Sequence, residues 1–287
     1  MNRCRIEVDE LGYRWYVCDE DSALPLRSSE FIVYSVLKDL AEPSRVFVDV
    51  GAHVGRYAIR LAKHFRKVVA IEPIPRNVEI LRKNIELNSV SNIEVLQIAA
   101  GDRRGRIEIS NAGSHSSVLD ASTSKDKVYV DMYPLDEVID RVDVVKIDVE
   151  GYEIEVVKGM RRIIAECRPI LVIEHHEFYR PSLGRSTLRE IAKMLSDYIA
   201  WRIGEAHFIW VPKEVDILKE RSRFRTAIYA FWCFHVLENI ASNRPWYLGL
   251  PETWWWGMSP IEFMLKLPEH IAKEDSWFVE AKKLLEL

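Results

Sequence analysis

Residues 45–60, RVFVDVGAHVGRYAIR, limit the possible folds of this chain more than any other segment. Strand-favouring residues at 46–50 lead into a turn with glycines at 51 and 55, and a helical pattern of apolar residues follows. A strand, a tight turn and a helix in this order form a unit that binds nucleotide-like ligands at the carboxyl end of a parallel sheet. We therefore predict a ligand of that class beside this turn.

The same alternation continues along the chain. Apolar runs at 46–50, 67–72, 93–99, 142–149 and 170–176 are predicted strands, and 57–65, 76–88 and 153–167 are predicted helices. Two more runs, 107–110 and 128–133, are predicted to form an inserted hairpin or edge strands. A strand at 207–213, with a weakly marked partner near 198–204, would complete a seven-stranded sheet. The pattern indicates an α/β fold: a Rossmann-like, mostly parallel sheet with helices on both faces.

Both ends of the chain are predicted to extend this central domain, which we place at 43–214. Residues 1–42 are predicted to form a hairpin over 1–20 and a helix over 28–41, capped by Ser28 or Ser29. Residues 215–287 contain six of the nine tryptophans and are predicted to be a helical extension. This Trp-rich tail could cap the core, form a homodimer interface or offer aromatic faces to an acceptor.

Charge and apolar patterning restrict the location and partners of the protein. The formal net charge of −4 shows no basic bias, so nucleic acid is not the expected partner. The first residues lack the apolar segment of a signal peptide, and no apolar run is long enough to span a membrane. We expect a soluble, cytoplasmic protein whose partner is a small molecule or a glycan.

Cys4 and Cys18 bracket the predicted N-terminal hairpin. If Asp9 pairs with Tyr13 across the turn, Cys4 faces Cys18 and a cross-strand disulfide becomes possible, whereas a slip of one residue removes it. Because cytosolic thiols stay reduced, we favour two separate thiols.

Acidic and polar residues gather where the predicted strands end. Because parallel strands end at one edge of a sheet, these residues are expected to line one site. They are Asp49 after the first strand, Glu72 after the second, Gly101 and Asp102 after the third, Asp148 and Glu150 after the fourth, and Glu174 and His175 after the fifth.

Asp49 and the glycine spacing indicate which nucleotide-like ligand binds. Dinucleotide folds carry G-x-G-x-x-G around a pyrophosphate, whereas this turn reads G-x-x-x-G with His53 between Gly51 and Gly55. A carboxylate at Asp49 would repel a pyrophosphate and attract the sulfonium of S-adenosylmethionine. Glu72 can accept both ribose hydroxyls, which supports a ribose ligand of either kind.

Three segments resemble the FkbM family of methyltransferases, within the class I S-adenosylmethionine-dependent fold. VFVDVGAHVGRYAI resembles the family's first motif, VVAIEPIPRNVEILRKNIELN its second, and VDVVKIDVEGYEIEVVKGM its most distinctive motif, K-x-D-x-E-G-x-E. The resemblance covers about residues 28–180. His53 departs from the family pattern, which usually has asparagine there.

The resemblance implies the contacts of the cofactor. Asp49, Gly51, His53 and Gly55 would lie at its methionine end, Glu72 at the ribose, and Ala100, Gly101 and Asp102 around the adenine. The family's acceptors are mostly hydroxyls of sugars or other small molecules, so the implied reaction is O-methyl transfer.

A hydroxyl acceptor needs a base to remove its proton. We predict His175 or Asp148 for this role, with Glu150 as a further candidate, and we expect His176 to cap the strand or to hydrogen-bond a neighbouring acid. Asp148 could instead form a structural salt bridge, for example with Lys146. Asp148, Glu150, Glu174 and His175 could also gather a divalent metal, which we do not favour.

Two other functions remain open from the sequence. The first is an NAD-dependent oxidoreductase on the same fold, and the second is a binding protein that has kept the fold without catalysis. Binding of S-adenosylhomocysteine and of NAD would separate the three hypotheses.

Overall fold

The computed structural model describes residues 4–26, 31–110, 127–176, 187–204 and 206–217, and eight further residues up to 230. The chain divides into one compact unit of residues 1–226, which holds all helices and strands of the described residues, and a second of 227–287. The predicted cap at Ser28 or Ser29 and almost all of the Trp-rich tail lie outside the described residues. The proposed domain boundaries at 43 and 214 stay predictions.

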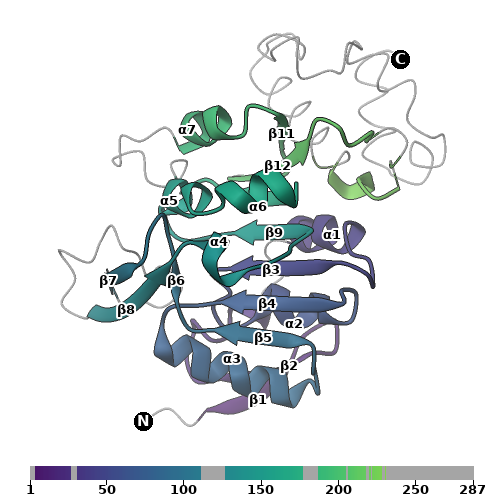
Figure 1. Cartoon of the computed structure of the whole chain (residues 1–287). Coiled ribbons are helices and arrows are strands. Elements are labelled where there is room, and N and C mark those ends of the chain that lie inside the picture. Colours follow the sequence, from purple (N-terminus) through teal and green to yellow (C-terminus); the bar gives the residue numbers. More distant parts are fainter. Residues whose placement is uncertain are drawn as a thin grey trace, which may run out of the picture. The chain divides into compact units, whose positions relative to one another are not determined.

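A seven-stranded sheet forms the centre of the first unit and confirms the predicted α/β fold (Figure 1). Across the sheet the strands are β11 (Tyr198–Arg202), β12 (His207–Pro212), β10 (Ile170–Glu174), β9 (Val144–Ile147), β3 (Val46–Val50), β4 (Lys67–Ile71) and β5 (Ile93–Leu96). β12 runs antiparallel to both of its neighbours, and the other pairs are parallel. The weakly marked partner near 198–204 is therefore a real strand.

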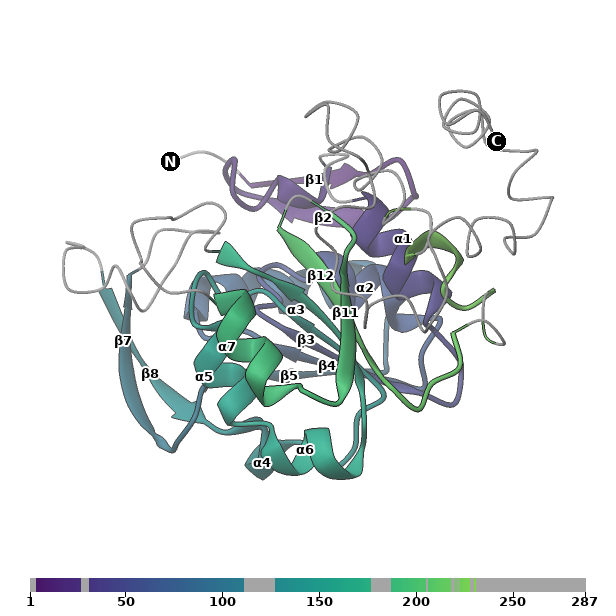
Figure 2. The same cartoon turned by 90° about the horizontal axis from the view of Figure 1, so that it is seen from above.

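Helices cover both faces of this sheet (Figure 2). One face carries α1 (Phe31–Asp39), α2 (Arg56–Ala62) and α3 (Pro75–Leu87), and the other carries α4 (Leu135–Val138), α5 (Glu153–Lys158), α6 (Arg161–Glu166) and α7 (Thr187–Met194). The α4–α7 side encloses a large apolar core that includes Val48, Ile147 and Ile173. Strand side chains alternate between faces, so Asp49 and Lys146 belong to the α1–α3 side.

The predicted helix over 153–167 is two helices, α5 and α6, that meet at Gly159. A Cβ at position 159 would lie 2.0 Å from the carbonyl oxygen of Gly101. The chain therefore needs a glycine there, and the approach of Gly101 accompanies the break in the helix.

The segment at 93–100 also differs from its prediction. Residues 93–96 form β5 in the main sheet, whereas Ala99–Ala100 form β6 in a separate three-stranded sheet. β6 pairs in parallel with β8 (Lys127–Tyr133), and β8 pairs antiparallel with β7 (Gly105–Ser110). The last two strands confirm the predicted inserted hairpin.

The N-terminal hairpin consists of β1 (Arg5–Val8) and β2 (Arg14–Val17), followed by a 3₁₀ helix, η1 (Leu24–Leu26). The backbone N–H of Asp9 donates to the carbonyl of Tyr13, and Arg5 pairs with Val17. This register places Cys4 opposite Cys18, and the two form a disulfide. The prediction of two separate thiols is wrong for this reason. Such a bond is unusual in the cytosol, which is the compartment expected from the sequence.

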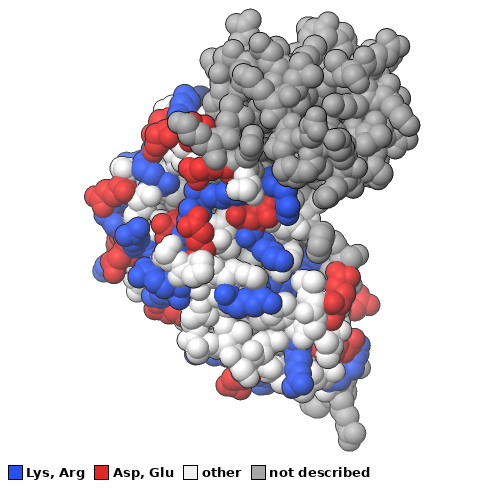
Figure 3. Space-filling view, turned by 90° about the vertical axis from the view of Figure 1, so that its right-hand side faces the viewer, with Lys and Arg blue, Asp and Glu red and all other residues white. Residues whose placement is uncertain are grey.

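Two observations bear on the surface of the protein. Lys and Arg are interspersed with Asp and Glu over the described part of the face in Figure 3. Among the described residues, no helix has the length and apolar character needed to cross a bilayer.

Candidate active site

The carboxyl ends of the central strands lie together where the order of the strands along the chain changes direction across the sheet. From β3 the chain builds β4 and β5 on one side, whereas β9 and β10 lie on the other side. These strands are parallel, so their carboxyl ends lie along one edge (Figure 1). Ligands of open α/β sheets bind at such a switch point.

Gly51 allows the turn after β3 to pack against the turn after β9. Its φ is +81°, and a Cβ there would lie 1.8 Å from the carbonyl oxygen of Asp148. The N–H groups of Gly51 and Ala52 both donate to the carbonyl of Ile71, at 2.9 and 3.0 Å. Gly55, with φ of +95°, precedes α2. The glycine turn therefore connects the ends of three strands.

Asp49 lies beneath this turn and is fully buried. Its Oδ2 accepts a hydrogen bond from the N–H of Ala58 in α2, whereas Oδ1 has no hydrogen-bond partner among the described residues. Burial raises the pKa of Asp49 to about 6, although the nearby Lys146 ammonium opposes that shift. Asp49 therefore anchors the start of α2 and keeps one carboxylate oxygen unpaired.

Glu72, at the end of β4, is held by three donors. Oε2 accepts from the N–H of His53 at 2.9 Å, and Oε1 accepts from the N–H of Ile74 and the amide of Asn77. Burial raises the pKa of Glu72, and these hydrogen bonds act against it. A carboxylate has about four acceptor positions. Three of these positions are occupied, and the remaining one is mainly on Oε2. Glu72 can therefore accept one ribose hydroxyl more easily than the two that a bidentate contact requires.

The three residues expected around an adenine lie in and after β6. Ala100 is buried, and the N–H of Gly101 donates to the carbonyl of Tyr133 in β8. The carboxylate of Asp102 pairs with the exposed guanidinium of Arg103. The small sheet thus positions this segment.

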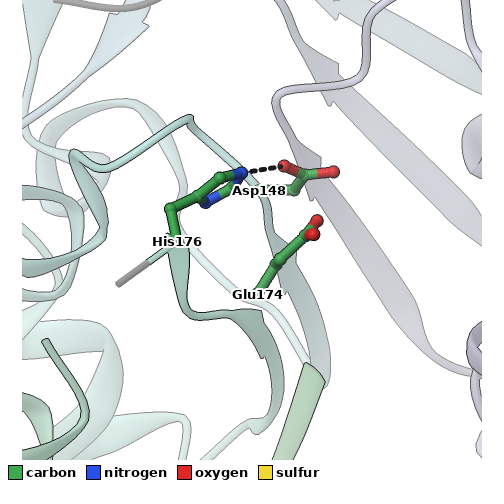
Figure 4. Close-up of side chains that lie close together, drawn as sticks. All are labelled: Asp148, Glu174 and His176. Atoms are coloured by element: carbon green, nitrogen blue, oxygen red, sulfur yellow. Dashed lines mark ion pairs between the residues drawn. The ribbon is translucent and has the colours of Figure 1, made fainter. Parts of the chain in front are cut away.

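A second group of polar side chains follows from the register of β9 and β10. Lys146 lies opposite Val172, which places Asp148 and Glu174 at matching positions two residues further along the same face. The Lys146 ammonium lies 2.8 Å from Oδ2 of Asp148, so the expected salt bridge is present. Figure 4 shows Asp148, Glu174 and His176 pointing toward one another.

His176 is held among carboxylates and is 3% exposed. Its Nδ1 lies 2.7 Å from Oε1 of Glu153, while its Nε2 lies 3.5 Å from Oε1 of Glu150 and 3.7 Å from Oδ1 of Asp148. Burial alone would lower the pKa of His176, but Glu150, Glu153 and Asp148 raise it to about 11. The imidazole therefore carries a proton at neutral pH. The expectation that His176 hydrogen-bonds a neighbouring acid is met.

The carboxyls of Asp148 and Glu174 are shifted in opposite directions. Burial opposes ionisation of Asp148, but Lys146 and His176 hold its pKa well below the usual range. Burial and the charge of Asp148 raise the pKa of Glu174, against the effect of His207, whose Nε2 lies 3.4 Å from Oε2 of Glu174. Glu174 is thus the stronger base of the two.

His175 does not join this group. Its side chain is fully buried on the opposite face of β10, where the ring contacts Phe208 and Trp210. Burial lowers its pKa to about 3. The placement of His175 in the acceptor space is therefore corrected, because residues 174 and 176 share one face and 175 faces the core. Strand alternation places Glu174 and His176 on one face of the chain, but only the pairing of Val172 with Lys146 shows that this face carries Asp148.

Among the described residues, Asp148, Glu174 and His176 could hold a metal ion, because one ligand atom from each lies within 4.8 Å of the others. Of the predicted metal group, Asp148 and Glu174 are brought together, His176 takes the place of His175, and Glu150 is not part of the group. Two carboxylates and an imidazole suit Mg²⁺ or Mn²⁺. Against this, Lys146 already neutralises Asp148.

Several known proteins are similar to this chain in sequence. Residues 49–199 match the family model described as the methyltransferase FkbM domain. The methyltransferase sdnD of Sordaria araneosa is 25% identical over 262 residues, which cover 75% of this chain and 95% of sdnD. The hexuronic acid methyltransferase AglP of Haloferax volcanii is 25% identical over 198 residues, and the match covers 67% of this chain and 76% of AglP. The crystal structure of methyltransferase FkbM from Methylobacillus flagellatus KT aligns with a TM-score of 0.44 at 26% identity, covering 59% of this chain and 44% of that one.

Proposed function

Because the chain belongs to the FkbM methyltransferase family, we propose that it is an S-adenosylmethionine-dependent O-methyltransferase acting on a hydroxyl of a sugar, a glycan or another small molecule. The observation that carries the proposal is the meeting of two groups at one edge of the sheet. The glycine turn with Asp49 and Glu72 offers a cofactor site, and Asp148, Glu174 and His176 offer an acceptor site beside it.

The residues of the glycine turn fit this cofactor. Asp49 has a fully buried oxygen without a hydrogen-bond partner among the described residues, and Glu72 retains acceptor capacity for a ribose hydroxyl. Asp49, Gly51, His53 and Gly55 would hold the methionine end, Glu72 the ribose, and residues 100–102 the adenine. When bound, S-adenosylmethionine supplies an electrophilic methyl group on a sulfonium.

The residues at the carboxyl ends of β9 and β10 would bind the acceptor and receive its proton. Asp148 is a weak base because Lys146 and His176 stabilise its ionised form. We assign it to binding, together with Glu150. Glu174 has a raised pKa beside this fixed charge, and opposite shifts of two neighbouring carboxyls often separate a base from a binding group. We assign the general base to Glu174, in place of His175.

The acceptor class has separate support. The relative AglP is named for hexuronic acid, a sugar. On this chain, Lys146 and His176 are already paired with Asp148, Glu150 and Glu153, so the support for an acidic sugar comes from this relative alone. Sugars that carry a carboxylate are therefore the first acceptors to test.

The test combines cofactor binding with methyl transfer. Isothermal titration calorimetry with S-adenosylhomocysteine should show binding, whereas NAD should not bind. A labelled-methyl transfer screen should then find product with glucuronate-type sugars or with neutral sugars. Binding of NAD alone would support the oxidoreductase alternative. Cofactor binding without transfer to any sugar, lipid or cell extract would support the non-catalytic alternative.

A further inference from the structure

His53 in the glycine turn is held by the N-terminal segment. Its backbone lies at φ of +50°, a conformation that is unfavourable for a residue other than glycine and needs outside support. Two contacts supply that support. Its N–H donates to Oε2 of Glu72, and its ring Nε2 lies 2.9 Å from Oδ2 of Asp21. The side chains of His53 and Asp21 are largely covered, with exposed fractions of 19% and 24%.

Asp21 is itself kept in place by a closed turn. The hydroxyl of Ser22 accepts from the N–H groups of Cys18 and Asp19, and the N–H of Ser22 donates to the carboxylate of Asp19. The Cys4–Cys18 disulfide closes the hairpin just before this turn. Asp21 therefore presents its carboxylate from a rigid support.

Asn84 connects the N-terminal segment to Val54, the next residue of the glycine turn. The fully buried amide of Asn84 in α3 accepts from the N–H of Tyr16 in β2 and donates to the carbonyl of Val54. His53 thus contacts the N-terminal segment directly, and Val54 is connected to it through Asn84. This segment precedes the residues 49–199 that match the family model.

We infer that Asp21 is a positioning residue of the cofactor site, which acts through the His53 ring to keep the His53 N–H on the Glu72 carboxylate. Glu72 is the group assigned to the ribose, and its Oε2 must point consistently to receive a hydroxyl. The inference rests on the proposed function, because it concerns the same cofactor. It adds residues 4–22 to that site and gives His53, the residue that departs from the family pattern, a role.

The test measures S-adenosylhomocysteine affinity by calorimetry. Asp21→Ala should weaken binding about tenfold, the value of one well-placed hydrogen bond. Asp21→Asn can still hydrogen-bond the ring and should stay within about twofold of wild type. Glu20→Ala changes an exposed acid in the same turn and should have no effect. Thermal melting of each apo variant checks that the fold is intact.

A double-mutant cycle tests the route through His53. If Asp21 acts through the ring, Asp21→Ala should add no further loss of affinity to that of His53→Ala. Wild-type affinity in Asp21→Ala, or losses that simply add, would overturn the inference while leaving the proposed function intact. Failure of the wild-type protein to bind S-adenosylhomocysteine would overturn both.

Discussion

His176 and Glu153 share a buried hydrogen bond, in which Nδ1 of the imidazole lies 2.7 Å from Oε1 and the two side chains are 4% and 0% exposed. Glu153 begins α5 and His176 follows β10, so the bond connects the two segments that carry the candidate acceptor site. Oε2 of Glu153 has no hydrogen-bond partner among the described residues. The imidazole and the N–H of Gly151, which donates to the same Oε1 at 2.8 Å, together compensate for a carboxylate in the core.

Removing the imidazole should destabilise the protein. His176→Ala would leave the buried Glu153 carboxylate with the Gly151 N–H but without its charged partner, and we expect a loss of about 3 kcal/mol in the free energy of unfolding. The pKa of His176 is raised in the folded state to about 11, so its contribution is complete below about pH 6.5 and is lost as the pH rises toward 11. Urea unfolding at pH 6 is the measurement, with His64→Ala, at a half-buried histidine, as the control. Equal losses in the two variants would contradict the role of the buried pair.

His175 should make the stability depend on pH in the acid range. Its folded-state pKa is lowered to about 3, so below about pH 6.5 the unfolded chain takes up a proton that the folded protein does not. The free energy of unfolding should therefore fall with decreasing pH, by up to about 1.4 kcal/mol per unit from this residue. His175→Phe should flatten the dependence between pH 6.5 and 5 in urea unfolding. An unchanged slope would show that His175 does not remain neutral in the folded protein.

Glu174→Gln should reduce catalysis without reducing cofactor affinity. Loss of a general base typically lowers kcat by about a hundredfold or more. Affinity for S-adenosylhomocysteine should stay within about twofold, because Glu174 is assigned to the acceptor. Steady-state kinetics and calorimetry measure the two effects, and Glu94→Gln, at an exposed acid of β5, is the control.

A divalent cation offers the rival explanation for Glu174. Dialysis against EDTA should leave methyl transfer unchanged if the carboxylate itself takes the proton. Loss of activity that Mg²⁺ or Mn²⁺ restores would instead make Asp148, Glu174 and His176 a metal site.

Opening the Cys4–Cys18 bond should destabilise the hairpin. A disulfide that closes a loop of this length contributes about 3 kcal/mol in the chain-entropy account. Because Asp9 in the hairpin pairs with the buried Arg60 of α2, the effect should reach the sheet domain and lower the melting temperature. Differential scanning calorimetry with and without dithiothreitol measures it. The Cys4→Ser/Cys18→Ser protein should have the same melting temperature in both conditions. An unchanged melting temperature of the wild-type protein in dithiothreitol would refute the prediction.

Several parts of the fold could be predicted because their signals are local. The β3 strand begins and ends at Val46 and Val50 as predicted, since its apolar run is followed directly by a glycine turn. The helix predicted over 153–167 could not be divided correctly, because its break at Gly159 accompanies a close approach of Gly101, which is distant in sequence. The run predicted as one strand at 93–99 also forms two strands, because β5 pairs with β4 in the main sheet and β6 pairs with β8 in the small sheet.

For the candidate site, the sequence alone determined which strand ends carry acids, and so where a ligand is expected and which family the motifs resemble. These properties follow from residue order, because parallel strands always end at one edge. Only the tertiary structure decided which side chains face that edge. Alternation past the end of β10 turns His175 into the core and places His176 on the same face as Glu174, and pairing with β9 brings Glu174 beside Asp148. The hairpin contact between Asp21 and His53 also depends on packing, because residues far apart in the chain meet only when their elements pack together.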